Sequence, residues 1–399
     1  MAGEAGTRGL RVLITNRTLA TRTGTELYVR DLAVALARRG HAPIVYTPRP
    51  GDVAREIRAE TIPVTDDLRT IAEPPDVIHG HHALELLAAL LAFPGVPAVA
   101  VCHSWIGWAD APLSFPRVLR HVAVDDTCRD RLRFEHGIPD ARIEVVLNAV
   151  DLQRFVPRPP LPARPKRALI FSNAAGLGRA QDTAIHAACA AAGIAVELVG
   201  ASAGRSVARP EEVLRDYDLV FAKAKAAIEA MSVGAAVILC DAVGAGPMVT
   251  TANLDALRRV NFGMRALREP CTPAYLGAQI ARYDAADARA VSDAVRAGAG
   301  TAPMVDQLCA LYADVVAEHA AGAAADPHAA LQAESRAAAA FLQGLSPRLH
   351  ERDLLAGAFQ GLLRRPVLGR MLRQAAAGSR RGWIAELFDL FQRRGMDGP

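Results

Sequence analysis

Histidine side chains gather beside two short apolar runs of this 399-residue chain. His79, His81 and His82 fall within DVIHGHH, and His103 ends the run Val99–His103. Histidines at i and i+2 share one face of a strand, so His79 and His81 could in principle hold a metal ion. The sequence places no third ligand beside them and has no D-x-D motif in a strand context, so we predict no metal site. The alternative is that these imidazoles form the wall of a crevice at the strand ends.

One acidic and two basic residues form a second group. Only three of the 46 basic residues are lysines, and Lys223 and Lys225 are separated by a single residue. In extended backbone, residues two apart point the same way, so we expect both ammonium groups on one face. A helix with Glu229 in its first turns follows, and its N-terminus adds a partial positive charge. The grouping suits a diphosphate, whereas the plainer interpretation is a solvated lysine pair at an edge.

The elements that must position these residues are short apolar runs alternating with helical patterns. Such alternation predicts an α/β fold with doubly wound parallel sheets. A helix is expected over Gly24–Arg39. The expected strands are Leu10–Thr15, Ile44–Thr47, Val77–His79, Val99–His103, His121–Val124, Glu144–Leu147, Ala168–Ser172, Val196–Gly200, Leu219–Ala222 and Ala236–Cys240.

Proline and alanine content divide the chain. Five prolines within residues 155–167 predict a stiff connector, and an alanine-rich then arginine-rich helical composition begins near residue 321. The predicted parts are an N-terminal Rossmann-like domain (1–156), a linker (157–167), a C-terminal Rossmann-like domain (168–320) and a helical extension (321–399). The basic amphipathic tract 354–395 could pack on the domains, dock a partner protein or lie on an anionic membrane.

Composition excludes several classes of protein. A formal net charge of +4 is too small to indicate a nucleic-acid binder. The six cysteines are scattered without a C-x-x-C motif, as in reduced proteins of the cytoplasm. Glu85 and two prolines interrupt the longest apolar stretch, and the first nine residues lack an apolar signal core. We therefore expect a cytoplasmic protein, or one held peripherally at the inner membrane face.

Five segments stand in the order of a known set of motifs. They are TGTE with its following helix (from residue 23), DVIHGHH (76–82), AVCHSW (100–105), LNAVDLQRF (147–155) and AIEAMSVGAAVILCDAVGAG (227–246). Over about residues 10–320 the chain resembles the retaining GT-B glycosyltransferases of family 4. The resemblance implies two Rossmann-like domains around a cleft. It also implies transfer of a sugar from a nucleotide-sugar to an acceptor hydroxyl, with retention and without a metal or other cofactor.

The resemblance extends to particular residues. It implies that His103 contacts the transferred sugar and that Glu229 accepts hydrogen bonds from the nucleotide ribose. Our predicted donor-binding residues are Gly24, Ser172, Asn173, Lys223, Lys225 and Glu229. Our predicted acceptor-binding residues are Glu26, His81 and Asn148. The acceptor would be a glycan, a lipid or a small molecule, and no nucleic acid is expected as a partner.

The sequence departs from the family pattern at the donor site. The first glutamate of the usual E-x7-E motif would fall at Phe221, and FSNAAGLGR replaces the expected arginine and lysine after the first strand of the second domain. Our hypothesis is that Lys223 and Lys225 neutralise the leaving diphosphate, with Lys225 and His103 as the catalytic pair. Two alternatives stay open. One is a degenerate GT-B protein that binds a nucleotide or glycan without turnover, and the other is a GT-B-fold sugar-nucleotide epimerase.

Overall fold

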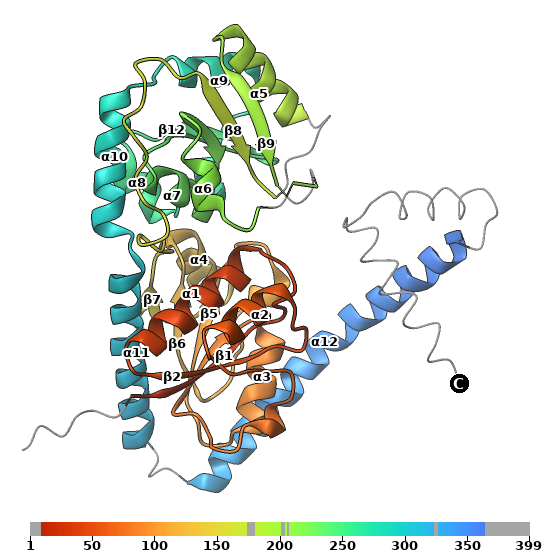
Figure 1. Cartoon of the computed structure of the whole chain (residues 1–399). Coiled ribbons are helices and arrows are strands. Elements are labelled where there is room, and N and C mark those ends of the chain that lie inside the picture. The colour runs from red at the N-terminus through yellow and green to blue at the C-terminus, as the bar shows by residue number, and fades with distance from the viewer. Residues whose placement is uncertain (1–8, 174–179, 201–203, 206, 323–325, 364–399) are drawn as a thin grey trace, which may run out of the picture.

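The computed structural model describes residues 9–173, 180–200, 204–205, 207–322 and 326–363. Two α/β domains are stacked, the first drawn in red to orange and the second mainly in green to cyan (Figure 1). The chain crosses between them twice, and the two crossings are tied together by hydrogen bonds. The Val150 N–H donates to the Ala299 carbonyl (2.9 Å), and the Thr301 N–H donates to the Val150 carbonyl (3.2 Å).

The first domain is built on a seven-stranded parallel sheet in the order β3-β2-β1-β4-β5-β6-β7. Its central strands are buried, and Val12, Leu13 and Ile14 of β1 are fully buried, as expected of a sheet covered on both faces. The strands are β1 (Arg11–Thr15), β2 (Ala42–Tyr46), β3 (Val64–Thr65), β4 (Val77–His81), β5 (Ala98–Cys102), β6 (Val118–Ala123) and β7 (Ile143–Val145). The α-helices are α1 (Gly24–Arg38), α2 (Asp52–Ala59), α3 (Ala83–Ala92) and α4 (Asp126–Asp130), followed by the π-helical turn Arg131–Glu135.

The second domain has a five-stranded sheet in the order β12-β11-β10-β8-β9. The strands are β8 (Arg167–Phe171), β9 (Ala195–Val199), β10 (Leu219–Ala222), β11 (Ala236–Asp241) and β12 (Gly244–Met248). The helices are α5 (Ala180–Ala191), α6 (Pro210–Leu214), α7 (Ala224–Ser232), α8 (Leu254–Arg259), α9 (Pro273–Ile280) and α10 (Ala285–Gly298).

All ten expected strands form, with ends that differ by a few residues. The antiparallel edge strand β12 was not expected, because its sequence GAGPM reads as a loop. An edge position tolerates Pro247, which cannot donate a ladder hydrogen bond. Glycine is needed at 246, because a Cβ there would lie 2.5 Å from the Ala266 carbonyl oxygen.

Helix α11 (Thr301–Gly322) corrects the predicted domain boundary at residue 320. Although it follows the second domain in sequence, it runs along the first domain (Figure 1). Val305, Leu308 and Tyr312 are fully buried in the core of that domain. The strand pattern stops near residue 250, and a lone amphipathic helix carries no sequence sign of which sheet it covers.

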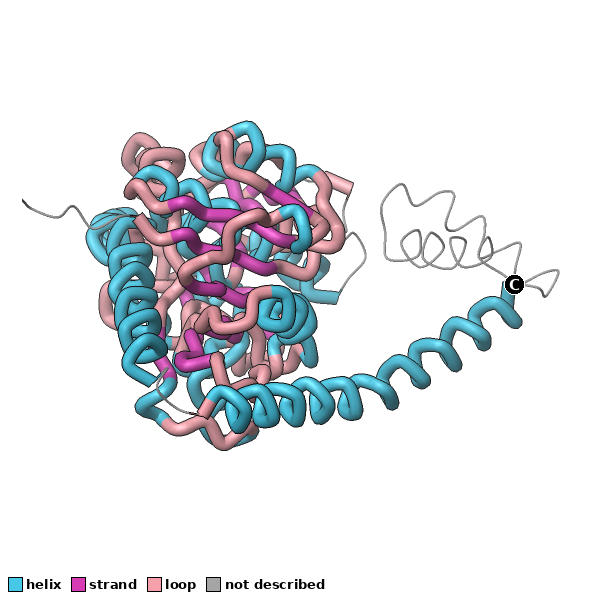
Figure 2. The backbone as a smooth tube through the Cα atoms, turned by 90° about the horizontal axis from the view of Figure 1, so that it is seen from below, coloured by secondary structure: helices cyan, strands magenta, loops and turns pink. Residues whose placement is uncertain are grey.

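Helix α12 (Pro327–Leu363) begins on the first domain and then extends away from the body (Figure 2). Arg117 donates to both carboxylate oxygens of Glu334 (2.7 and 3.0 Å), and Phe341 packs against the core beneath α3. Most of the basic tract 354–395 lies outside the described residues. In the part of the chain that is described, no helix is long and apolar enough to cross a membrane.

Candidate functional site

A pocket between the two domains gathers residues from the carboxyl-terminal edges of both sheets, where ligands bind in open α/β folds. The first domain contributes the start of α1, and the second contributes the segments after β8 and β9 and the first turns of α7. The lining residues are Arg22, Thr23, Gly24, Leu27, Phe171, Ser172, Asn173, Val199, Gly200, Arg205, Val207, Pro210, Lys225, Ala226 and Glu229. The structure thus brings together five of the six predicted donor-binding residues.

Gly24 begins helix α1 on the first-domain side of the pocket. A Cβ built on Gly24 would meet no atom within 4 Å, and the preceding residue, Thr23, makes no side-chain cap hydrogen bond. The first N–H groups of α1 therefore receive no cap from the Thr23 side chain, and they carry the partial positive charge of the helix end beside an uncrowded glycine. This arrangement can bind an anionic group.

Glu26 does not face an acceptor, contrary to the prediction. It is 2 % exposed, and its carboxylate accepts hydrogen bonds from the hydroxyls of Thr21 (2.8 Å), Thr23 and Thr25 (3.1 Å). A carboxylate has acceptor positions for several donors, so one side chain can hold the whole turn before α1. Glu26 shapes the loop that carries Gly24.

Glu229 lies on α7 at the second-domain wall of the pocket. It is 7 % exposed, and burial raises the pKa of its carboxyl to about 7. The nearby Lys225 ammonium lowers that pKa, and the Asp31 carboxylate raises it. Glu229 is therefore a buried carboxyl group whose charge changes near neutral pH, facing a cavity wide enough to admit a ligand group.

The two lysines do not point the same way, contrary to the prediction. Lys223 is the N-cap of α7, and Ala224 has a φ of +49°, so the backbone turns between them and Lys225 is already helical. Lys223 forms an ion pair with Asp241 and does not line the pocket. Lys225 lines the pocket, and its Nζ lies 2.7 Å from Oδ2 of Asp31 in the first domain.

Ser172 and Asn173 follow β8 and line the same pocket. The Ser172 hydroxyl donates to Oδ1 of Asp241 (3.0 Å), the carboxylate that also pairs with Lys223. Asp241 ends β11, which is not a direct neighbour of β8 in the sheet. The shared Asp241 carboxylate therefore orients the Ser172 hydroxyl at the pocket wall. Lys223 contacts the pocket only indirectly, through Asp241.

His103 follows β5 and turns its imidazole toward the interior of the first domain. Its Nε2 lies 2.6 Å from Nδ1 of His81, and the ring of Tyr28 meets the His103 ring edge-on at 5.0 Å. Burial lowers the pKa of His103 to about 3, and the positive charge of Lys225 contributes to that lowering. His103 is therefore a neutral imidazole close to Lys225, although it is not among the residues that line the pocket.

His81 is fully buried, so this arrangement does not present it to an acceptor as predicted. Its ring stacks on that of His103, with the ring centres 4.7 Å apart, and so helps to position His103. His79 is also fully buried, and its Nδ1 lies 2.7 Å from the Tyr312 hydroxyl on α11. Burial lowers the pKa of His79 to about 3 and that of His81 well below its usual range. Among the described residues, no group of three or more His, Cys, Asp or Glu side chains is arranged to hold a metal ion.

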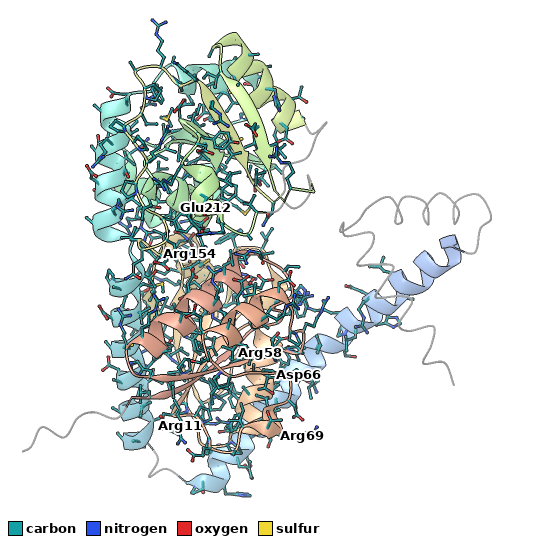
Figure 3. The ribbon with its side chains drawn as sticks, in the orientation of Figure 1. Arg11, Arg58, Asp66, Arg69, Arg154 and Glu212 are labelled. Carbon is teal, nitrogen blue, oxygen red and sulfur yellow. The ribbon has the colours of Figure 1, made fainter. Side chains whose placement is uncertain are left out.

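Asn148, the third predicted acceptor residue, lies in the chain crossing rather than in the pocket. Its backbone carbonyl accepts a hydrogen bond from Nη2 of Arg258 in the second domain (2.7 Å). Arg154 lies at the same junction, as Figure 3 shows, and its Nη2 donates to Oε2 of Glu211 (2.9 Å). The Asn148–Arg258 contact ties the crossing to the second domain and leaves Asn148 without a direct part in the pocket.

Two arginines that line the pocket, Arg22 and Arg205, were not predicted from the sequence. Arg22 precedes the TGTE segment, and its Nη2 donates to the Ala208 carbonyl across the junction (3.0 Å). Arg205 follows β9, and its side chain is 59 % exposed. Arg22 could have been found from its position beside the first motif, whereas nothing in the local sequence distinguishes Arg205 from other surface arginines.

Comparisons with known proteins bear on the fold and on the enzyme class. Residues 22–154 match the model of Glycosyltransferase Family 4. A glycosyltransferase from Rickettsia africae is 13% identical, with a TM-score of 0.56 over 77% of this chain and 99% of that one. Anabaena Alr3699/HepE, solved with UDP and glucose, is 14% identical, with a TM-score of 0.57 over 76% and 99%. No curated protein matches the sequence significantly.

The two kinds of comparison support different conclusions. At 13% and 14% identity the structural likeness shows the fold, so the predicted GT-B architecture is confirmed. The family match adds the enzyme class, and the prediction of a glycosyltransferase is confirmed at that level. The match lies in the first domain, whereas most of the predicted donor-binding residues lie in the second.

Proposed function

We propose that this chain transfers a sugar from a nucleotide-sugar donor to an acceptor hydroxyl, with retention of configuration and without a metal ion. One observation carries the proposal. Gly24, Ser172, Asn173, Lys225 and Glu229 come from distant parts of the sequence and line one pocket between the two domains. Anabaena HepE, which shares the fold, was solved with UDP and glucose.

Glu229 is the group suited to the nucleoside. An ionised carboxylate only accepts hydrogen bonds, so it can take both hydroxyls of a ribose. Its burial makes such bonds stronger than they would be in water. At a pKa of about 7, part of the Glu229 population is ionised at neutral pH, and a donor that needs the carboxylate would draw the equilibrium further toward it.

Three cationic side chains and a helix end surround the place where we propose that the diphosphate binds, and two of them, Lys225 and Arg22, already pair with Asp31 and Glu56. Lys225, Arg22 and Arg205 line the pocket, together with the N-terminus of α1 at Gly24. Positive charge placed beforehand at the leaving diphosphate stabilises the charge that develops there in the transition state. Metal-independent transfer is therefore consistent with the residues that line the pocket.

His103 is the residue proposed to contact the transferred sugar. It follows β5 at the carboxyl-terminal edge of the first sheet, and its neutral imidazole can exchange hydrogen bonds with sugar hydroxyls. Retention is proposed from the motifs that resemble retaining family-4 enzymes. The acceptor would approach from the first domain as a glycan, a lipid or a small molecule.

A donor panel tests the proposal. The purified full-length chain is first screened for thermal stabilisation by nucleotide-sugars, because a specific ligand stabilises the folded state by mass action. Release of nucleoside diphosphate is then measured with each hit, in the presence and absence of EDTA, and NMR assigns the anomer formed. Stabilisation without turnover would instead favour the non-catalytic binder. A product of inverted configuration would contradict retention.

Glu229→Gln and Lys225→Ala should each weaken the interaction with the donor. Lys223→Ala is the matched control, because Lys223 lies two residues away and faces Asp241 instead of the pocket. Equal effects of Lys223→Ala and Lys225→Ala would contradict the assignment of the diphosphate to this pocket.

A further inference from the structure

The loop after His103 exposes large apolar side chains at the edge of the first domain. Trp105 is 36 % exposed, Ile106 71 % and Trp108 43 %, and these include two of the three tryptophans of the chain. Phe134, on the neighbouring π-helical turn, is 72 % exposed. We call these four residues the aromatic patch. Grouped exposure of this kind marks an interaction surface more often than scattered apolar residues do.

The backbone beneath the aromatic patch is held firmly. The Ser104 hydroxyl accepts the N–H groups of Ile106 (3.3 Å) and Gly107 (3.0 Å). Arg131 donates to the carbonyls of Ser104 and Gly107 (3.0 Å to the latter). The Asp110 carboxylate accepts the backbone N–H of His103, which ties this loop to the proposed site. The apolar side chains are therefore displayed on a fixed scaffold.

Each ring of the aromatic patch carries an arginine on its face. The guanidinium carbons lie 5.8 Å from the Trp105 ring centre (Arg265), 5.6 Å from that of Trp108 (Arg348) and 5.1 Å from that of Phe134 (Arg133). These arginines come from the second domain, from α12 and from the first domain, respectively.

The charges around the aromatic patch favour an anionic partner. Arg265 is paired with Asp130 (2.7 Å), and Arg131 is paired with Glu135 (3.5 Å). Arg133 and Arg348 form no ion pair with any residue in the described ranges, so neither guanidinium group has a carboxylate partner within salt-bridge distance.

We propose that the aromatic patch docks on the headgroup region of an anionic bilayer, so that the acceptor that reaches His103 is lipid-borne. Tryptophan rings suit the boundary between water and hydrocarbon, and the aliphatic Ile106 suits the apolar side of that boundary. Unpaired arginines bind lipid phosphates. The claim that the acceptor is lipid-borne rests on the proposed function, whereas the claim that the aromatic patch docks on a bilayer does not.

Vesicle sedimentation of the full-length chain tests the docking. Vesicles of equal parts phosphatidylcholine and phosphatidylglycerol should sediment the chain, and phosphatidylcholine alone should sediment much less. Trp105→Ser/Ile106→Ser/Trp108→Ser should lose at least about tenfold in vesicle affinity, and Arg133→Gln/Arg348→Gln should lose most of the preference for anionic vesicles. The matched control is Leu91→Ser/Leu331→Ser/Val243→Ser, which removes three exposed apolar residues outside the aromatic patch.

Several outcomes would overturn the docking proposal. One is failure of the intact chain to sediment, and another is equal loss in the patch variant and its control. A third is loss in Trp383→Ser/Phe388→Ser/Phe391→Ser alone, which would assign binding to the C-terminal tract. Self-association that is lost in the patch variant, without vesicle binding, would assign the patch to a second copy of the chain.

A second readout keeps this proposal separate from the proposed function. Without vesicles, the patch variant should release nucleoside diphosphate from the donor at the wild-type rate, because the patch residues do not line the pocket. If the wild type releases no nucleoside diphosphate, that result counts against the proposed enzyme and leaves the docking proposal intact. Labelled sugar transferred to an isolated membrane fraction should partition into organic solvent. Label confined to the aqueous phase would overturn a lipid-borne acceptor.

Discussion

Lys225 and Asp31 form an ion pair that crosses the junction of the two domains at the wall of the pocket. Lys225 Nζ lies 2.7 Å from Asp31 Oδ2, and the two side chains are 15% and 14% exposed. Arg30 binds the other oxygen of the same carboxylate (2.6 Å). Although burial alone would raise the pKa of Asp31, Lys225 and Arg30 together hold it below its usual range. The lysine proposed to meet the diphosphate is therefore already engaged by a partner in the opposite domain.

Asp31→Asn should free the Lys225 charge and tighten binding of the nucleoside diphosphate by about fivefold. Isothermal titration measures the affinity, and in a Lys225→Ala background the same change should have no effect. Asp130→Asn is the control, because it breaks the Arg265 pair, which also crosses the junction but lies outside the pocket. Equal effects in both variants would mean that Asp31 acts only by joining the domains.

Glu229 should make both stability and donor binding depend on pH. Its pKa is about 7 in the folded state and 4.5 when unperturbed, so the folded state binds the proton more tightly. The contribution of the protonated carboxyl to stability is complete below pH 4.5 and is lost as the pH rises through 7. Glu229→Gln should remove this loss and be more stable than wild type at pH 8, by on the order of 2 kcal/mol.

Donor affinity should change in the opposite direction, because the carboxylate that accepts the ribose hydroxyls forms as the pH rises. Affinity should therefore increase through about pH 7 in the wild type and stay flat in Glu229→Gln. Titrations between pH 5.5 and 8.5 check this, and a flat profile in the wild type would contradict the role of Glu229.

His103 should contribute to turnover without titrating. Burial holds its pKa at about 3, so the imidazole stays neutral in the physiological range. His103→Ala should lower kcat roughly 100-fold by the same factor at every pH between 5.5 and 8.5. His81→Phe should also lower kcat with little change in KM, because the 2.6 Å contact that orients His103 is lost, and His81→Gln should restore part of the rate. A histidine limb in the profile that disappears with His103→Ala would contradict this assignment.

Helix α11 should stabilise the first domain rather than the second. Leu308 is fully buried in the first core, so Leu308→Ala should lower the free energy of unfolding by about 2 to 5 kcal/mol. Hydrogen exchange should show that strands β1 and β4 lose protection while β8 and β10 do not. Loss of protection confined to the second sheet would contradict the packing described here. Leu331→Ala, at an exposed position of α12, serves as the control.

The sequence by itself determined the two sheets and most of the pocket. Continuous apolar runs such as β5 and β10 have one stable arrangement, because strands buried on both faces must pair in parallel beneath helices. Their carboxyl ends then bring Ser172, Lys225 and Glu229 to one edge, whatever the details of side-chain packing. The class of fold and five lining residues could therefore be predicted.

Only the tertiary structure decided which partner each polar side chain takes. One left-handed residue, Ala224, separated Lys223 from Lys225. The buried Glu26 took the threonine hydroxyls of its own loop as partners, and the buried His81 took His103. Asp31 contributes to the junction from within the helix of the first motif segment, at a position to which that motif assigns no role, and Arg205 contributes to the pocket from a segment without any motif. The spacing of residues along the chain determines only the direction in which neighbouring side chains point. Long-range pairs such as Lys225–Asp31 depend on how two separately folded domains meet, and α11 shows that even the domain to which a helix belongs is decided there.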